Sequence, residues 1–303
     1  MKIFTLIENT NLKNSVLDSE HGISFYIETA GKIFIFDCGQ SGLAWKNAGK
    51  LNLNLKKINF VVLSHSHYDH AGGFPALLKY VTPKKIYTGE NFWSEKFSKT
   101  DDGYIYRGAG FFADDLKNWG VEQKICRDIL QIEENIFLIG NFFRRYEFEI
   151  IPKKFVVGEN KIQDNFDDEI CLAIKNGGEI ILIVGCSHAG ILNIVSTVQE
   201  RLNLPIKMLI GGVHLQGADS ERIEKTLREL KNFGIKKFSL CHCSGENICK
   251  KINLPVLLSS DSHGINNIGN MDYIYPLLED IDFPSNLIIN YQPDLLWKIL
   301  NKQ

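Results

Sequence analysis

Residues 65–70, with the sequence HSHYDH, place three imidazoles and one carboxylate within six positions. If the chain is still extended at the first two histidines, His65 and His67 point to the same side, because side chains alternate along a strand. The turn that follows can bring Asp69 and His70 to a neighbouring point. The spacing therefore predicts one cation bound by the first two histidines and a second bound by Asp69 and His70.

Each of these cations would still lack ligands, which the ends of later strands must provide. His188, His214 and His242 each follow a predicted strand, and ligands bind at strand ends in open α/β sheets. We predict that His188 and His242 complete the metal site and that His214 binds metal or contacts the substrate. In an extended stretch, Cys241 and Cys243 face away from His242, so we expect them to pack behind it.

Such ligands narrow the choice of metal. Imidazole and carboxylate groups without thiolate suit zinc, manganese or iron(II). We therefore expect one or two divalent metal ions, with zinc as the first choice.

The elements that position these residues are alternating strands and helices. The apolar run at 58–64 is typical of a strand covered on both faces, and strands alternate with helices again from residue 170. We predict one domain over residues 1–303, with an aromatic-rich insertion at about 90–165 and a C-terminal tail at about 265–303. The insertion would either cap a pocket or form a loop-rich part of the core.

Composition restricts the class of partner. The chain has 303 residues, 44% hydrophobic and 23% charged, with a net charge of −2 and scattered lysine pairs, which argues against nucleic-acid binding. No apolar run approaches the length of a membrane span. The apolar run among the first residues is too short for a signal-peptide core. Seven cysteines, an odd number spread over the chain, do not form a secreted disulfide framework. We expect a cytoplasmic protein that acts on a small molecule and binds neither nucleic acid nor membrane.

The HSHYDH sequence resembles the HxHxDH signature of the metallo-β-lactamase superfamily. The resemblance extends over about residues 1–260 and implies an α/β fold, a four-layer αββα sandwich with one or two metals at the edge of its sheets. Asp37, in IFIFDCG, matches the aspartate that orients the metal-binding loop in this family; the alternative is a turn residue before Gly39. Asp69 would bind metal and accept a proton from water or orient it, which makes Asp37 and Asp69 the catalytic candidates.

One position departs from the pattern of the superfamily. Many members carry a Gly-Asp pair after a strand, and its aspartate bridges two metals; here Gly185 is followed by Cys186. Either His188 binds the first metal and no bridging carboxylate exists, or an acid from elsewhere fills the gap. Asp168 is a candidate for that acid.

Five short sequences, EHGISFYIE, HYDHAGG, GCSHAGI, GGVHL and CHCSG, are similar to a narrower branch. It is the 7,8-dihydropterin-6-methyl-4-(β-D-ribofuranosyl)-aminobenzene-5′-phosphate synthase type, which belongs to methanopterin biosynthesis. The branch implies a loop with His21 beside the site and makes Arg144 a candidate anion contact, with a surface cation as the alternative. Asp261 and His263 are either a local addition to the site or an ordinary turn, and we expect the turn. Five residues are thus candidates for contacting the substrate or supporting the ligands: His21, His214, Asp168, Cys186 and Arg144.

Three activities remain open for such a site. The first is a metal-dependent hydrolase that uses a metal-activated water on a small ester, lactone or phosphoester. The second is a transferase that condenses a pterin pyrophosphate with an aminobenzene riboside phosphate. The third is a non-hydrolytic redox or sensor protein. The aromatic insertion would give an apolar wall for an anionic, ring-bearing substrate.

Overall fold

The computed structural model describes residues 1–10, 15–245 and 248. The chain divides into two compact units, Met1–Gly245 and Glu246–Gln303, and the description below concerns the first. The predicted tail at 265–303, and with it Asp261 and His263, lies outside the described residues. That one domain spans the whole chain stays a prediction.

The first sheet contains six strands, in the order β1-β2-β3-β4-β5-β8. The first three strands are antiparallel, and β3, β4, β5 and β8 run parallel. A two-residue turn at Ala30 and Gly31, both with positive φ, joins β2 to β3 in a tight hairpin. The bounds of the strands are β1 Lys2–Ile7, β2 Ser24–Thr29, β3 Lys32–Phe36, β4 Phe60–Val62, β5 Lys85–Gly89 and β8 Glu122–Cys126.

The second sheet also contains six strands, in the order β16-β15-β14-β13-β10-β9. Strands β9, β10, β13 and β14 pair antiparallel, and β14, β15 and β16 run parallel. The parallel strands matter most for the site, because their carboxyl ends meet at one edge. The bounds are β9 Ile129–Glu133, β10 Ile136–Ile139, β13 Cys171–Asn176, β14 Glu179–Val184, β15 Ile206–Gly211 and β16 Lys237–Leu240.

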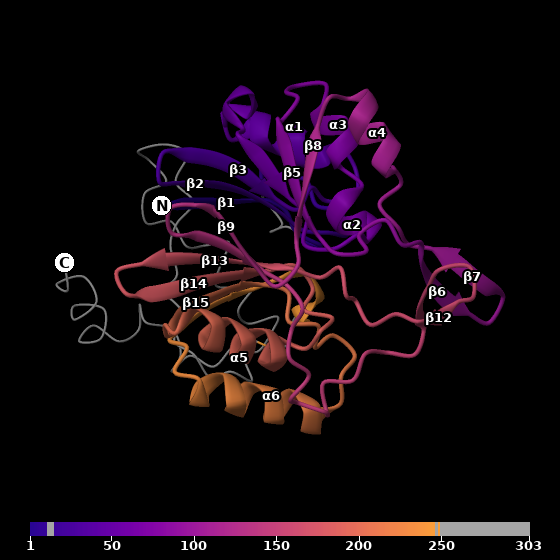
Figure 1. Cartoon of the computed structure of the whole chain (residues 1–303), viewed down its shortest axis with the longest axis vertical. Coiled ribbons are helices and arrows are strands. Elements are labelled where there is room, and N and C mark those ends of the chain that lie inside the picture. Colours follow the sequence, from indigo (N-terminus) through magenta and orange to yellow (C-terminus); the bar gives the residue numbers. More distant parts are fainter. Residues whose placement is uncertain (11–14, 246–247, 249–303) are drawn as a thin grey trace. The chain divides into compact units, whose positions relative to one another are not determined.

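Helices cover the outer face of each sheet, which gives four layers (Figure 1). One buried cluster, including Trp45 and Phe74, joins the first sheet to its helices. A second, including Phe34, Leu138 and Ile183, fills the space between the sheets. The predicted αββα fold is confirmed. The helices are α1 Leu43–Lys50, α2 Tyr68–Ala71, α3 Phe74–Leu77 and α4 Ala113–Asn118 on the first sheet, and α5 Ile191–Leu202 and α6 Ser220–Asn232 on the second, with 3-10 turns at Leu55–Lys57 and His242–Ser244.

A third sheet of four short strands, in the order β12-β11-β6-β7, projects from one side of the sandwich (Figure 1). Residues 90–165 therefore divide into two parts. Strands β8, β9 and β10 belong to the main sheets, while β6, β7, β11 and β12 form the small sheet. That this stretch is an insertion which caps a pocket or forms a loop-rich part of the core stays a prediction. The bounds are β6 Lys96–Thr100, β7 Gly103–Tyr106, β11 Phe155–Val157 and β12 Ile162–Gln163.

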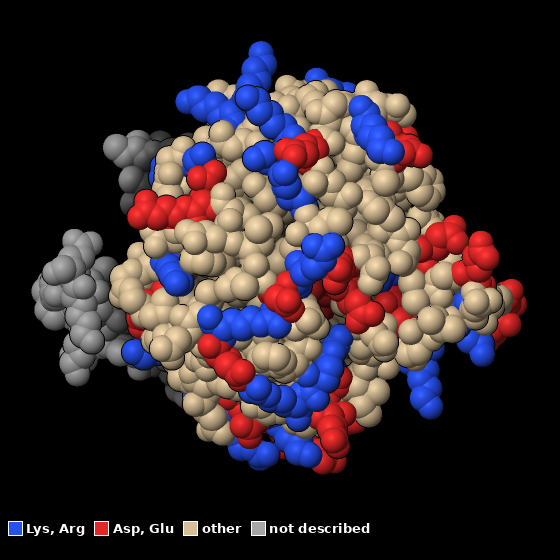
Figure 2. Space-filling model, in the orientation of Figure 1, with Lys and Arg blue, Asp and Glu red and all other residues tan. Residues whose placement is uncertain are grey.

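The surface seen in Figure 2 mixes both signs of charge, with blue and red side chains interspersed among tan. No helix within the described residues is both long and apolar enough to cross a membrane.

A buried ion cluster joins the small sheet to the sandwich. Lys96 Nζ on β6 lies 2.8 Å from Asp164 Oδ2 and 2.6 Å from Asp168 Oδ1. The three side chains are 3%, 4% and 0% exposed. A buried charge is tolerated only when it is paired, so each of these residues depends on the others.

We predict that Lys96→Met lowers the free energy of unfolding by about 3–5 kcal/mol, because two carboxylates would stay buried without their cation. Urea denaturation followed by circular dichroism measures the change. Lys99→Met is the matched control, since Lys99 is an exposed lysine on the same strand; its effect should stay within about 0.5 kcal/mol. Equal losses in the two variants would contradict the role of the ion cluster.

Candidate metal centre

Asp37 holds the HSHYDH loop in place. It follows β3, which pairs in parallel with β4, and its backbone N–H donates to Val62 O at 2.9 Å. Its carboxylate accepts hydrogen bonds from the backbone N–H and the hydroxyl of Ser64, both at 2.7 Å. Asp37 Oδ2 also lies 2.7 Å from His70 Nδ1. A carboxylate on Nδ1 leaves Nε2 of the same ring for a metal, as around many metal-binding histidines.

The first group of ligand atoms, which we call the histidine cluster, consists of His65, His67 and His188. One ring nitrogen from each lies within 4.8 Å of the others. Nε2 of His65, Nε2 of His67 and both nitrogens of His188 are buried and have no hydrogen-bond partner in the described part of the chain. Buried polar atoms are nearly always paired, so three facing imidazoles without partners fit a bound cation.

Burial keeps this cluster neutral. It lowers the pKa of His67 to about 3 and the pKa values of His65 and His188 well below the usual range. Neutral imidazole is the form that binds a metal ion. The charge state of the three rings therefore suits the same role as their geometry.

The second group, which we call the mixed cluster, consists of Asp69, His70 and His242. Asp69 Oδ2 lies 3.6 Å from His70 Nε2 and 3.4 Å from His242 Nε2, and the two nitrogens are 3.2 Å apart. Neighbouring ligands of a tetrahedral zinc with bonds of about 2.0–2.1 Å lie about 3.3–3.4 Å apart. The three separations match that value. His21 Nε2, on a half-exposed ring, lies 3.2 Å from Asp69 Oδ2 and is a further donor at this cluster.

The N-terminal strand positions His242. The backbone N–H of His242 donates to both carboxylate oxygens of Glu8 at 2.9 Å, and His242 Nδ1 lies 2.8 Å from Asn9 Oδ1. Asn9 thus contacts Nδ1 of His242 and orients its ring, as Asp37 does for His70. Sequence reasoning missed Glu8 and Asn9, because polar residues after a first strand are common and nothing in their spacing points to His242.

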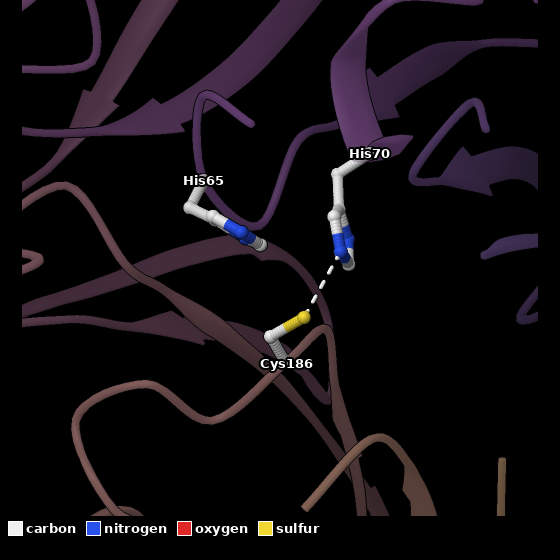
Figure 3. Close-up of side chains that lie close together, drawn as sticks. All are labelled: His65, His70 and Cys186. Atoms are coloured by element: carbon white, nitrogen blue, oxygen red, sulfur yellow. Dashed lines mark hydrogen bonds between the residues drawn. The ribbon is translucent and has the colours of Figure 1, made fainter. Parts of the chain in front are cut away.

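Cys186 lies between the two clusters, where many superfamily members carry an aspartate. Its Sγ is 3.1 Å from His70 Nε2, and it faces both His65 and His70 from the opposite sheet (Figure 3). Cys186 Sγ also lies within 4.8 Å of a ring nitrogen of His242 and of Cys243 Sγ. The expectation that Cys243 faces away from His242 is wrong, because the chain turns into a 3-10 helix at His242 with φ +54 instead of staying extended.

Asp168 does not occupy that gap. Its Oδ2 accepts a hydrogen bond of 2.8 Å from the backbone N–H of Ser66, and its Oδ1 binds Lys96. The carboxylate therefore supports the backbone between His65 and His67. The Asp168 carboxylate thus stabilises the HSHYDH loop and is not a ligand shared by the two clusters in this structure.

Two neighbours of Asp168 fix His188. The Phe166 ring stacks on the His188 ring at 3.8 Å and 13°. Glu169 accepts hydrogen bonds from the backbone N–H groups of His188 and Ala189 at 2.8 and 2.7 Å. Neither residue has a sequence signal of its own, since each acts through a contact between distant segments.

Both clusters open into one pocket of about 420 Å³. His214 lines it, with its ring 4.4 Å from that of His188, but it joins neither cluster. Arg144 is not among the lining residues; it is exposed and donates to Asn165 O at 2.6 Å. The lining residues include His21, His67, Tyr68, Asp69, Ser98, Arg107, Lys154, Phe155, Cys186, His188, His214, His242 and Cys243.

Residues 20–128 match the family model of the metallo-beta-lactamase superfamily. A crystal structure described as Tm1679, a metal-dependent hydrolase of the beta-lactamase superfamily, superposes with a TM-score of 0.71 at 31% sequence identity. The match covers 82% of this chain and 90% of that one. The chain belongs to the metallo-β-lactamase superfamily.

Two curated relatives are similar over most of their length. The 7,8-dihydropterin-6-methyl-4-(beta-D-ribofuranosyl)-aminobenzene-5′-phosphate synthase of Methanocaldococcus jannaschii is 33% identical over 265 residues, which is 81% of this chain and 88% of the relative. An uncharacterized protein of the same archaeon is 27% identical over 255 residues, 82% of this chain and 92% of the relative. The first relative confirms the expected similarity to that branch.

We predict that His67→Ala and His242→Ala each lose about one equivalent of metal per chain while the fold is retained, because each removes one ligand from a different cluster. Elemental analysis and circular dichroism measure the two quantities. His214→Ala is the control, since His214 lines the same pocket without joining a cluster, and it should keep its full metal content. Full metal content in the first two variants would exclude the ligand sets given above.

Proposed function

We propose that this chain is a metal-dependent hydrolase that cleaves a phosphoester bond of a small, ring-bearing substrate. The observation that carries this proposal is the pair of ligand clusters, histidine and mixed, which open into one pocket. Adjacent metal ions are a common arrangement for ester hydrolysis, since they hold the ester and the attacking water side by side.

The residues fit divalent ions of the zinc type. The histidine cluster offers three neutral nitrogens, and the mixed cluster offers two nitrogens and one carboxylate oxygen. These donors suit zinc first, and also manganese or iron(II). When bound, such ions polarise an ester oxygen and lower the pKa of a water molecule.

Asp69 has a second task besides holding metal. It lines the pocket, and its Oδ2 lies within 3.6 Å of three imidazoles. A carboxylate in that position orients the attacking water toward the ester. Asp37 acts indirectly, because it fixes the ring of His70 and the backbone of Ser64.

The pocket wall fits a substrate that contains a ring. Phe155 and Tyr68 line it, and the Phe155 ring lies 5.6 Å from the His67 ring and 5.2 Å from the His188 ring. An aromatic substrate can stack on such a wall while its ester group reaches the clusters.

A second candidate reaction is the condensation performed by a synthase. The relative that supports it is named for the synthesis of a pterin joined to a ribofuranosylaminobenzene 5′-phosphate and matches over 88% of its length. In this reaction a pterin pyrophosphate would form a bond to the aminobenzene partner as pyrophosphate leaves. The same clusters would hold the leaving group.

One experiment separates the two reactions. The metal-loaded protein is incubated with phenyl phosphate and, separately, with a dihydropterin methyl pyrophosphate with or without ribofuranosylaminobenzene 5′-phosphate. We expect metal-dependent release of phosphate from the simple ester, lost on chelation and in His67→Ala. Pyrophosphate released only when both pterin and aminobenzene substrates are present would contradict hydrolysis and favour the synthase. The absence of turnover with either, in protein with full metal content, would contradict both.

A further inference from the structure

Two cations line the pocket beside the metal clusters. Arg107 directly follows β7 and Lys154 directly precedes β11, so both come from the small projecting sheet. Backbone hydrogen bonds hold their positions: Arg107 N–H donates to Lys96 O at 2.8 Å, and Lys154 O accepts from Lys99 N–H at 2.7 Å. The two side chains therefore start from fixed points on either side of β6.

Neither cation pairs with a carboxylate of the described residues. Arg107 Nε donates to Ser98 Oγ at 3.0 Å, and its guanidinium lies 5.7 Å from the centre of the Tyr68 ring. Lys154 Nζ lies 5.2 Å from the centre of the Phe155 ring. By contrast, Lys96 on β6, the strand between them, is neutralised by two aspartates. The pocket thus has a positive side that no carboxylate in the described part of the chain neutralises.

Each cation lies against an aromatic ring of the pocket, Arg107 against Tyr68 and Lys154 against Phe155. Tyr68 lies between His67 and Asp69 in the sequence, and the Phe155 ring packs against the rings of His67 and His188. Neither cation belongs to a ligand cluster, so we expect them to hold a different group from the one at the clusters. A ring lying on Tyr68 or Phe155 would connect the two.

We propose that Arg107 and Lys154 form an anion subsite that binds a phosphate group which does not react, so that the substrate carries an anion at each end of a ring. This inference rests on the proposed function, because it names the substrate class of the same pocket. A guanidinium and an ammonium together recognise phosphate through charge-assisted hydrogen bonds. Both candidate reactions above admit a substrate with such a phosphate.

Binding of two probes to the metal-loaded full chain tests the subsite. 1,4-Phenylenebisphosphonate has a phosphonate at each end of one ring, and phenylphosphonate has a single one. Neither contains a phosphoester bond, so the proposed hydrolysis does not consume the probes. By isothermal titration calorimetry, we expect the bisphosphonate to bind at least about tenfold more tightly than phenylphosphonate. Arg107→Gln and Lys154→Gln should each remove most of that difference, with metal content unchanged, and Arg107→Lys should retain part of it.

Lys153→Gln is the matched control, because Lys153 is the exposed neighbour of Lys154 and is not among the lining residues. It should bind both probes as the unmodified protein does. Equal binding of the two probes by the unmodified protein would overturn the subsite, and so would an unchanged preference in both glutamine variants. Because this measurement needs no turnover, it tests the subsite separately from the proposed hydrolysis. Phosphate release from phenyl phosphate tests the hydrolysis.

Discussion

The candidate site depends on one buried carboxylate. Asp37 lies at the end of a central strand and accepts hydrogen bonds from the backbone and hydroxyl of Ser64 on the neighbouring strand end, while it contacts Nδ1 of His70. These contacts set the path of the chain through HSHYDH and the direction of a ligand ring. An uncompensated buried carboxylate would be costly, so the loop, the serine and the histidine stabilise Asp37 as much as it positions them.

The candidate ligands His188 and His242, and the pocket residue His214, lie together because three parallel strands end at one edge of the second sheet. His188, His214 and His242 follow β14, β15 and β16, which are neighbours in the second sheet. Residues from elsewhere in the chain position two of them: Glu169 and Phe166 contact His188, and Glu8 and Asn9 contact His242. The centre therefore combines both sheets, and the ligands can form it only after the sandwich has assembled.

Much of this could be predicted from the sequence, for physical reasons. Strand periodicity gave the alternation of elements, and strand ends must converge, so the gathering of His188 and His242 with the HSHYDH loop followed from local patterns. The division of residues 90–165 between the main sheets and a small sheet did not follow, because short strands with weak periodicity carry no sign of their partners.

The parts that could not be predicted depend on distant contacts. Cys186 is close to His70 only because the two sheets face each other at this edge. Arg107 and Lys154 look like any other surface cations in the sequence, and only the pocket distinguishes them from Arg144. Asp168 could be recognised as an acid near the site, but its partners, Lys96 and Ser66, lie 72 and 102 positions away in the chain.

We propose that each of the two neighbouring clusters holds a divalent cation. Anomalous diffraction from crystals of the zinc-loaded protein, recorded on both sides of the zinc absorption edge, tests it most directly. We expect two anomalous peaks, one within bonding distance of His65, His67 and His188 and one within bonding distance of Asp69, His70 and His242. Crystals with zinc in the solution but no peak at either cluster, or with zinc bound only at other residues, would contradict it.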